Sequence, residues 1–82
     1  MYQKPGSIKY KELYRQLGIN IAYYRKKANL SQYELSEKIG VSRTYLASIE
    51  APGMVVSFST DTLFQIADVL NVSIRQLFDF DK

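Results

Sequence analysis

The chain has 82 residues, of which 46% are hydrophobic and 23% are charged, and its formal net charge is +3. This length suits one compact domain, and the apolar content is typical of a chain that folds. The absence of cysteine and histidine excludes a disulfide scaffold and a thiolate zinc site, and removes the commonest general base. No stretch approaches the roughly 18 apolar residues of a membrane span, so we expect a cytoplasmic protein without membrane attachment, metal or cofactor.

Charge is distributed unevenly along the chain. Residues 1–43 carry nine Lys or Arg against three Glu, whereas residues 44–82 carry two against five acidic residues. A basic amino-terminal half suits a polyanion lying against one side of the molecule. Solvated surface charge is the simpler interpretation of the same pattern.

The first predicted element is a long amphipathic helix. Residues 1–7 are polar and are predicted to form a flexible arm, followed by one domain over residues 8–82. From about residue 8 to residue 28, apolar side chains recur at spacings of three and four. Gly18 weakens this helix and leaves open a bend or a restart, and Asn29 suits the left-handed conformation that ends a helix. The apolar face comprises Tyr10, Leu13, Tyr14, Leu17, Ile21, Tyr24 and Ala28.

Two short helices follow, joined by a tight turn. Ser31 and Glu34 form a capping box, which predicts a helix over residues 32–39 that Gly40 ends. A second N-cap residue comes directly after this turn.

That second N-cap is Ser42, which predicts a helix over residues 43–50. Pro52 and Gly53 end it, because proline cannot continue a helix.

A loop and two further helices complete the chain. Residues 54–58 are apolar but short and have no partner strand, so we predict a packed loop that serves either self-association or local packing. Ser59 or Thr60 caps the next helix, and Ser73 caps the last. The inward side chains are predicted to be Leu63, Phe64, Ile66, Ala67 and Leu70, then Ile74, Leu77 and Phe78.

The helices over residues 32–39 and 43–50, joined around Gly40, form a helix-turn-helix unit. At about 100° per residue, the second of these helices has one face that packs and one that stays free. The packing face holds Tyr45, Leu46 and Ile49, and the free face holds Arg43, Thr44, Ala47 and Ser48. The predicted fold class is all-α, a compact five-helix bundle containing a helix-turn-helix.

Residues at fixed offsets across this unit follow a known pattern. They are Ser31, Gln32, Leu35, Ser36 and Gly40, then Ser42, Arg43, Tyr45, Leu46, Ile49 and Glu50. With them the segment resembles the phage-repressor and Cro-type helix-turn-helix family, also called the xenobiotic-response-element family, and the likeness extends from about residue 17 to residue 78. The resemblance implies a lambda-repressor-like DNA-binding domain that regulates transcription, with a repressor as the expected kind of regulator.

The resemblance also implies which residues meet DNA. The helix over residues 43–50 is expected in the major groove, with Arg43, Thr44 and Ser48 at the base edges. The chemistry agrees, because the planar fork of Arg43 suits guanine O6 and N7, and Thr44 offers a methyl group to thymine. Tyr45 faces the core, although its hydroxyl is a further candidate for a phosphate contact.

Other residues support this interface. The resemblance places Gln32 where it touches phosphate and braces the recognition helix. Backbone N–H groups at the start of each short helix are phosphate donors, which adds Ser42 to the DNA-binding set. Arg25 and Glu50 match the positions of the internal ion pair of the family, so we assign them a structural role.

The sequence departs from the family after Glu50, where Ala51, Pro52 and Gly53 replace the usual Asn or Arg followed by Gly. Pro52 has no N–H, so a phosphate contact usual there is not expected. Ala47 adds no hydrogen-bonding group to the free face, and base specificity must depend on few side chains.

The main functional hypothesis is a sequence-specific regulator that binds double-stranded DNA as a homodimer, with no small-molecule ligand evident. The dimer surface is open between residues 54–58 and the carboxyl end with Leu77, Phe78 and Phe80, and both segments also suit closure of the core. The alternative hypothesis is a protein-interaction module such as an antitoxin or antirepressor component. An enzyme is the least favoured class, because no nucleophile, base and orienting group are apparent.

Overall fold

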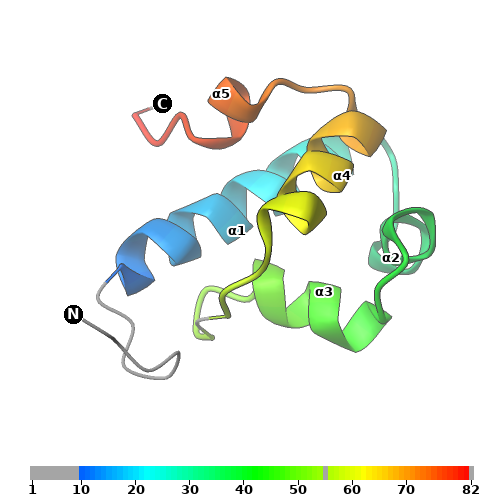
Figure 1. The fold of residues 1–82 in the computed structure, drawn as a ribbon, viewed down its shortest axis with the longest axis horizontal. Coiled ribbons are helices and arrows are strands. Elements are labelled where there is room, and N and C mark those ends of the chain that lie inside the picture. Colours follow the sequence, from blue (N-terminus) through cyan, green and yellow to red (C-terminus); the bar gives the residue numbers. More distant parts are fainter. Residues whose placement is uncertain (1–9, 55, 82) are drawn as a thin grey trace.

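The computed structural model describes residues 10–54 and 56–81, and over these ranges the chain forms helices and no strand (Figure 1). The all-α prediction is therefore confirmed, whereas the arm predicted over residues 1–7 lies outside the described residues. The helices are α1 (Lys11–Lys27), α2 (Gln32–Ile39), α3 (Arg43–Glu50), α4 (Thr60–Leu70) and α5 (Ile74–Leu77).

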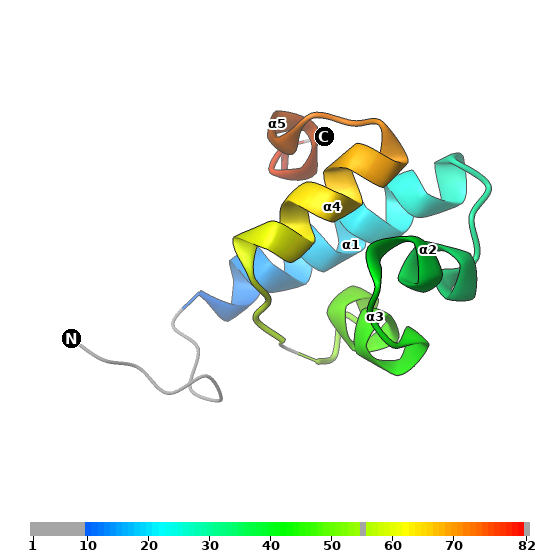
Figure 2. The ribbon, with the colours of Figure 1, turned by 45° about the vertical axis from the view of Figure 1, so that its right-hand side comes forward.

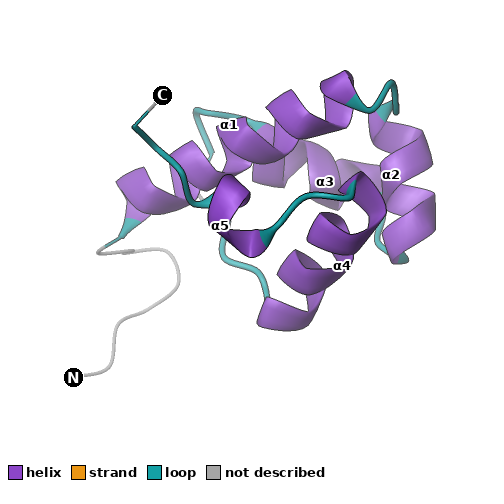
Figure 3. Cartoon of the chain, turned by 90° about the horizontal axis from the view of Figure 1, so that it is seen from above, coloured by secondary structure: helices purple, strands orange, loops and turns teal. Residues whose placement is uncertain are grey.

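The helices surround a single core. α4 lies across α1, and α3 and α5 lie on opposite sides of this pair (Figures 1 and 2). α2 packs against both α3 and α4, so the helix-turn-helix is held on two sides. α5 contacts both α1 and α4, as the view from above shows (Figure 3).

Side-chain caps fix the start of each helix after α1. Ser31, Ser42, Ser59 and Ser73 each accept a hydrogen bond from the backbone N–H three residues later, which satisfies a donor that the helix leaves open. The structure thus selects Ser59 over Thr60 as the cap of α4. The residues predicted to end α1 and α2 in the left-handed conformation do so, since φ is 60° at Asn29 and 74° at Gly40.

Gly18 has a packing role instead of bending α1, which continues through it from Lys11 to Lys27. A Cβ atom on Gly18 would lie 2.1 Å from the backbone oxygen of Ile49 at the end of α3. Such a distance is far inside ordinary contact, so only glycine lets α1 and α3 approach this closely. Gly18 therefore sets the position of α3 against α1.

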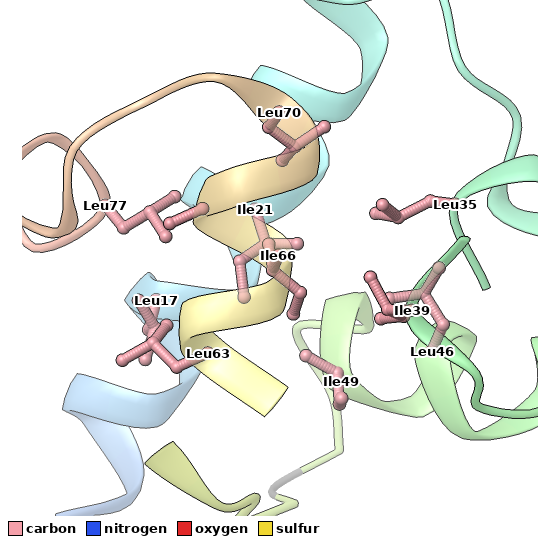
Figure 4. Packing of buried hydrophobic residues seen from close by; sticks show 11 residues of the cluster. Leu17, Ile21, Leu35, Ile39, Leu46, Ile49, Leu63, Ile66, Leu70 and Leu77 are labelled. Atoms are coloured by element: carbon pink, nitrogen blue, oxygen red, sulfur yellow. The ribbon is translucent and has the colours of Figure 1, made fainter. Parts of the chain in front are cut away.

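The core draws on all five helices (Figure 4). Side chains of α2 and α3 meet those of α1 and α4 between the two pairs, and the one buried residue of α5 closes the far side. Their burial is the main stabilising contribution and makes the helix-turn-helix part of one packed unit. The buried apolar residues are Leu17, Ile21, Leu35, Ile39, Leu46, Ile49, Leu63, Ile66, Ala67, Leu70 and Leu77.

Two predicted core residues are exposed. Phe64 is 53% exposed because it follows the buried Leu63 and points about 100° away from it around α4. Phe78 is 47% exposed because α5 ends at Leu77 and Phe78 is already its C-cap. Both predictions of inward side chains were wrong.

The apolar face of α1 is buried only in part. Leu17 and Ile21 lie in the core, and Tyr24 packs against it, as predicted. Tyr10, Leu13 and Ala28 at the two ends of the face are instead exposed. The face is longer than the layer of helices that covers it.

The segment after α3 packs against the core as a loop. Phe58 is half-buried, and its ring meets the ring of Tyr14 edge-on with centroids 6.0 Å apart. Val56 also packs against the core, whereas Met54 is exposed. The described part of this loop thus serves local packing, one of the two roles that the sequence left open.

A buried amide ties the carboxyl end of the described chain to α1. The Nδ2 of Asn20 donates to the backbone oxygen of Leu77 at 2.8 Å and to that of Asp79 at 3.1 Å. These two bonds hold the segment after α5 against the middle of α1, where Phe80 packs on the core.

Candidate nucleic-acid interface

The free face of α3 forms an outward ridge. Arg43 and Thr44 are exposed and Ser48 is half-buried, whereas Leu46 and Ile49 on the opposite side are buried. Within residues 10–54 and 56–81, no hydrogen bond or ion pair engages the side chain of Arg43. We name Arg43, Thr44 and Ser48 the recognition ridge, since their polar groups face away from the core.

Two hydroxyl groups near the ridge serve α3 itself. The Oγ of Ser42 accepts from the backbone N–H of Tyr45 at 3.0 Å, and the Oγ of Ser48 donates to the backbone oxygen of Thr44 at 3.1 Å. Ser42 is exposed, so its oxygen combines a capping role with access to solvent. The hydroxyl of Ser48 keeps its acceptor capacity for an outside donor.

Tyr45 lies between the ridge and the core. Its ring is half-buried and packs against the core, as its place beside Leu46 and Ile49 predicts. Its hydroxyl donates to the backbone oxygen of Ser57 at 3.4 Å, which links α3 to the following loop.

A buried ion pair fixes the end of α3 to α1. The Nε and Nη2 atoms of Arg25 donate to the two carboxylate oxygens of Glu50 at 2.8 and 3.0 Å. Their side chains are only 9% and 4% exposed, and the remaining Nη1 of Arg25 donates to the backbone oxygen of Leu30 at 2.7 Å. The resemblance assigned this pair a structural role, and the geometry is that of two groups that satisfy each other in the interior.

Gln32 joins the same network from α2. Its Nε2 donates to the Oε1 of Glu50 at 3.0 Å, so one carboxylate receives bonds from both α1 and α2. This contact connects the first residue of α2 with the last residue of α3 and braces the two helices against each other. The sequence suggested a bracing role for Gln32, but it contained no signal that Glu50 would be the acceptor.

The start of α2 already holds a carboxylate. Glu34 accepts from the backbone N–H of Ser31 at 2.8 Å, and the Oγ of Ser31 accepts from the N–H of Glu34 at 3.0 Å. The backbone N–H of Ser31, followed by its hydroxyl, lowers the pKa of the Glu34 carboxyl below its usual value. Because this carboxylate uses one of the open donors, fewer remain at the start of α2 for a phosphate.

Positive charge is available close to the helix-turn-helix. Lys26 and Lys27 are exposed at the carboxyl end of α1, and Lys38 is exposed at that of α2. Lys27 also lies 5.8 Å from the centre of the Tyr23 ring. These three lysines and Arg43 all belong to the basic amino-terminal half of the chain.

Comparison with known families gives residues 21–77 as a match to the helix-turn-helix model. The chain belongs to the helix-turn-helix family. This assignment confirms the resemblance that the sequence motifs indicated. The matched range runs from Ile21 to Leu77 and so includes the whole network of Arg25, Gln32 and Glu50.

Regulatory proteins are among the relatives of this helix-turn-helix chain. It is 40% identical over 63 residues to the HTH-type transcriptional regulator SinR of Bacillus subtilis, covering 77% of this chain but 56% of SinR. It is 41% identical over 61 residues to the control protein C.SmaI of Serratia marcescens, covering 74% of this chain and 70% of C.SmaI. The chain thus spans little more than half the length of SinR.

The fold of this helix-turn-helix chain is also similar to that of a regulator solved with DNA. A crystal structure of SinR in complex with DNA superposes with a TM-score of 0.69 at 40% identity, covering 77% of this chain and 98% of that one. Among the helices that the structure describes, none is long and apolar enough to cross a bilayer.

Proposed function

We propose that this chain is a sequence-specific regulator of transcription that binds double-stranded DNA, with α3 in the major groove. The observation that carries the proposal is the recognition ridge, a row of polar side chains on a short helix whose other face is buried. A short helix of this kind at the molecular surface fits the major groove, which is about 12 Å wide. The relation to SinR, which has been solved in complex with DNA, supports it.

Each residue of the interface has a distinct role in this proposal. Arg43, in the first turn of α3, reads guanine through its two parallel donors, and Thr44 and Ser48 contact neighbouring base edges. Ser42 lies beside the ridge and contacts phosphate, and the hydroxyl of Tyr45 does so by exchanging its 3.4 Å bond to the backbone oxygen of Ser57 for one to phosphate. Gln32 has one amide hydrogen engaged by Glu50 and a second for phosphate.

The network of Arg25, Gln32 and Glu50 serves the interface indirectly. A recognition helix must be held in a fixed orientation, because base contacts depend on the angle at which it enters the groove. The network and the close contact at Gly18 both act on the last turn of α3. We assign Arg25 and Glu50 to positioning and not to DNA contact.

The proposed active form is a homodimer. One domain of this size covers a single half-site, and two domains on half-sites about 34 Å apart reach a higher affinity than one alone. The alternative of a protein-interaction module predicts a ridge that binds another polypeptide. An exposed arginine on the ridge, in a chain whose amino-terminal half is basic, favours DNA over that alternative.

The experiment begins with selection of bound duplexes from a random pool. With the selected site, Arg43→Ala should weaken binding by about 1 to 3 kcal/mol, roughly 5- to 150-fold, and relax the preference at one base pair. Arg75→Ala, an exposed arginine on α5, is the matched control and should leave both unchanged.

Salt dependence separates the two classes of partner. The logarithm of the binding constant should fall with the logarithm of salt concentration by about 0.9 for each phosphate neutralised. A chain that selects no duplex in dilute buffer would refute the proposal. Unchanged affinity and preference in Arg43→Ala would refute the assignment of Arg43 to base contact.

A further inference from the structure

The hydroxyl group of Ser48 is already engaged as a donor. Its Oγ donates to the backbone oxygen of Thr44 at 3.1 Å, one turn earlier in α3. A serine hydroxyl has one hydrogen and two lone pairs, so a hydroxyl that donates within its own helix offers only acceptor sites to a group outside. Ser48 is half-buried on the free face of α3, and these acceptor sites therefore belong to the recognition ridge.

The other side chains of the free face have a different polarity. Arg43 has five donors and no acceptor, and Ala47 has no hydrogen-bonding group. The side chain of Thr44 is exposed, and no hydrogen bond engages it within residues 10–54 and 56–81, so its hydroxyl can either donate or accept. The free face thus runs from donors at Arg43, through a group of either kind, to an acceptor at Ser48.

We propose that Ser48 is a specificity-determining residue that selects a base with an amino group in the major groove, which is adenine or cytosine. The inference rests on the proposed function, in which α3 lies in that groove. Adenine presents its N6 amino group there and cytosine its N4 amino group, whereas guanine and thymine present the carbonyl oxygens O6 and O4. An amino group can donate to Ser48 while the bond from Ser48 to Thr44 stays intact.

Every base pair contains one base with an amino group and one with a carbonyl oxygen at this place in the groove. Ser48 therefore does not choose between A·T and G·C pairs. It determines which strand carries the amino group at the position that it reads, so the selected sites should show adenine or cytosine on one strand and thymine or guanine on the other.

A carbonyl oxygen opposite Ser48 removes one hydrogen bond from the complex. The hydroxyl either leaves two acceptors facing each other or turns its hydrogen from Thr44 to the base. Both arrangements have one bond fewer than the contact with an amino group. The loss of one ordinary hydrogen bond corresponds to about 2- to 10-fold in affinity.

The place of Ser48 along α3 indicates which base pair it reads. Ser48 follows Arg43 by five residues, which is about 7.5 Å along the helix axis at about 1.5 Å per residue. Base pairs are stacked about 3.4 Å apart, so the two side chains of a helix lying along the groove read pairs about two positions apart. We expect a half-site with a guanine for Arg43 and, about two pairs away, an adenine or cytosine for Ser48.

The test combines removal of the hydroxyl group with removal of the amino group. Duplexes carry the selected site intact or with purine in place of adenine, or 2-pyrimidinone in place of cytosine, at the position whose preference changes in Ser48→Ala. Loss of the amino group should weaken binding of the full wild-type chain by about 2- to 10-fold more than binding of Ser48→Ala. Both proteins meet the same altered duplex, so any change in the duplex itself cancels.

Two further variants serve as controls. Ser48→Thr keeps a hydroxyl on Cβ and should keep the preference for adenine or cytosine, whereas Ser48→Ala should lose it. Thr60→Ala removes an exposed hydroxyl at the start of α4, away from the ridge, and should leave the preference unchanged. The preference is a ratio of affinities for two duplexes, so a smaller fraction of folded protein would lower both affinities equally.

Two results would overturn this inference and leave the proposed function standing. One is an equal effect of the lost amino group on wild type and on Ser48→Ala. The other is a preference for guanine or thymine that disappears in Ser48→Ala. In both cases Arg43→Ala would still weaken binding to the selected site, which separates the role of Ser48 from the placement of α3 in the groove. A wild type that selects no duplex would refute both.

Discussion

Gly18→Ala gives the sharpest test of the packing, because local and tertiary effects predict opposite signs. In an isolated helix, alanine in place of glycine stabilises by about 0.5 to 1 kcal/mol. In this domain the added methyl group would lie 2.1 Å from the backbone oxygen of Ile49 and 3.2 Å from its carbonyl carbon. The new contact is with backbone, so no side-chain rotation relieves it.

The magnitude follows from the distance. The two helices must separate by about 1 Å before the methyl carbon reaches the roughly 3.3 Å of a close carbon–oxygen contact. Overpacking of this kind costs about 1 to 3 kcal/mol, of which the helix propensity of alanine offsets less than about 1 kcal/mol. A net loss of about 1 to 2 kcal/mol lowers the Tm of a domain of this size by roughly 5 to 15 °C.

Thermal unfolding followed by circular dichroism measures this loss. Gly53→Ala is the matched control, because a Cβ atom there meets nothing within 4 Å, and its Tm should stay close to that of wild type. Gly40→Ala meets nothing either, but its φ of 74° disfavours alanine, so a moderate loss is expected from backbone strain alone. A Tm for Gly18→Ala equal to or above that of wild type would refute the close approach of α1 and α3.

The buried ion pair and the capping box give two further predictions. Glu50→Ala should destabilise by about 3 to 5 kcal/mol in urea unfolding, since it leaves the Arg25 guanidinium buried without its partner, while Arg25→Met combined with Glu50→Leu should recover most of the loss. A double variant no more stable than Glu50→Ala would contradict that explanation. The lowered pKa of Glu34 means that its stabilising contribution is present above the usual value of 4.5 and is lost as the pH falls through the folded-state pKa. An NMR titration of the Glu34 carboxyl should show the lowered pKa. Ser31→Ala removes the hydroxyl but keeps the backbone N–H, so it should raise the pKa only part of the way toward the usual value. If the pKa does not rise, the hydroxyl contributes nothing to the shift.

The helix-turn-helix could be predicted from sequence because its signals are local. A cap residue and a glycine lie within a few positions of the helix ends they determine, and the bounds of α2 and α3 agree with the predicted ranges 32–39 and 43–50. The separation of Leu46 and Ile49 from the free face follows from helix geometry alone.

Other features depend on residues far apart in the chain. Gly18 was expected to weaken α1, and only the proximity of Ile49 reveals its packing role. The bonds from Asn20 to the segment after α5 span 57 and 59 positions, and nothing in the local pattern indicates them. Phe64 was assigned to the core by its apolar character. It is 53% exposed, because no other described element covers that side of α4.

The separation of the recognition ridge from the core bears on how this domain can change. Arg43 and Thr44 are exposed, and neither belongs to the core cluster or to the network around Glu50. Substitutions at these positions should therefore alter the preferred operator with little loss of folding stability, since exposed positions away from special features usually tolerate change within about 0.5 kcal/mol. The same scaffold can in this way acquire new operators, by gene duplication or by laboratory selection, without rebuilding its interior.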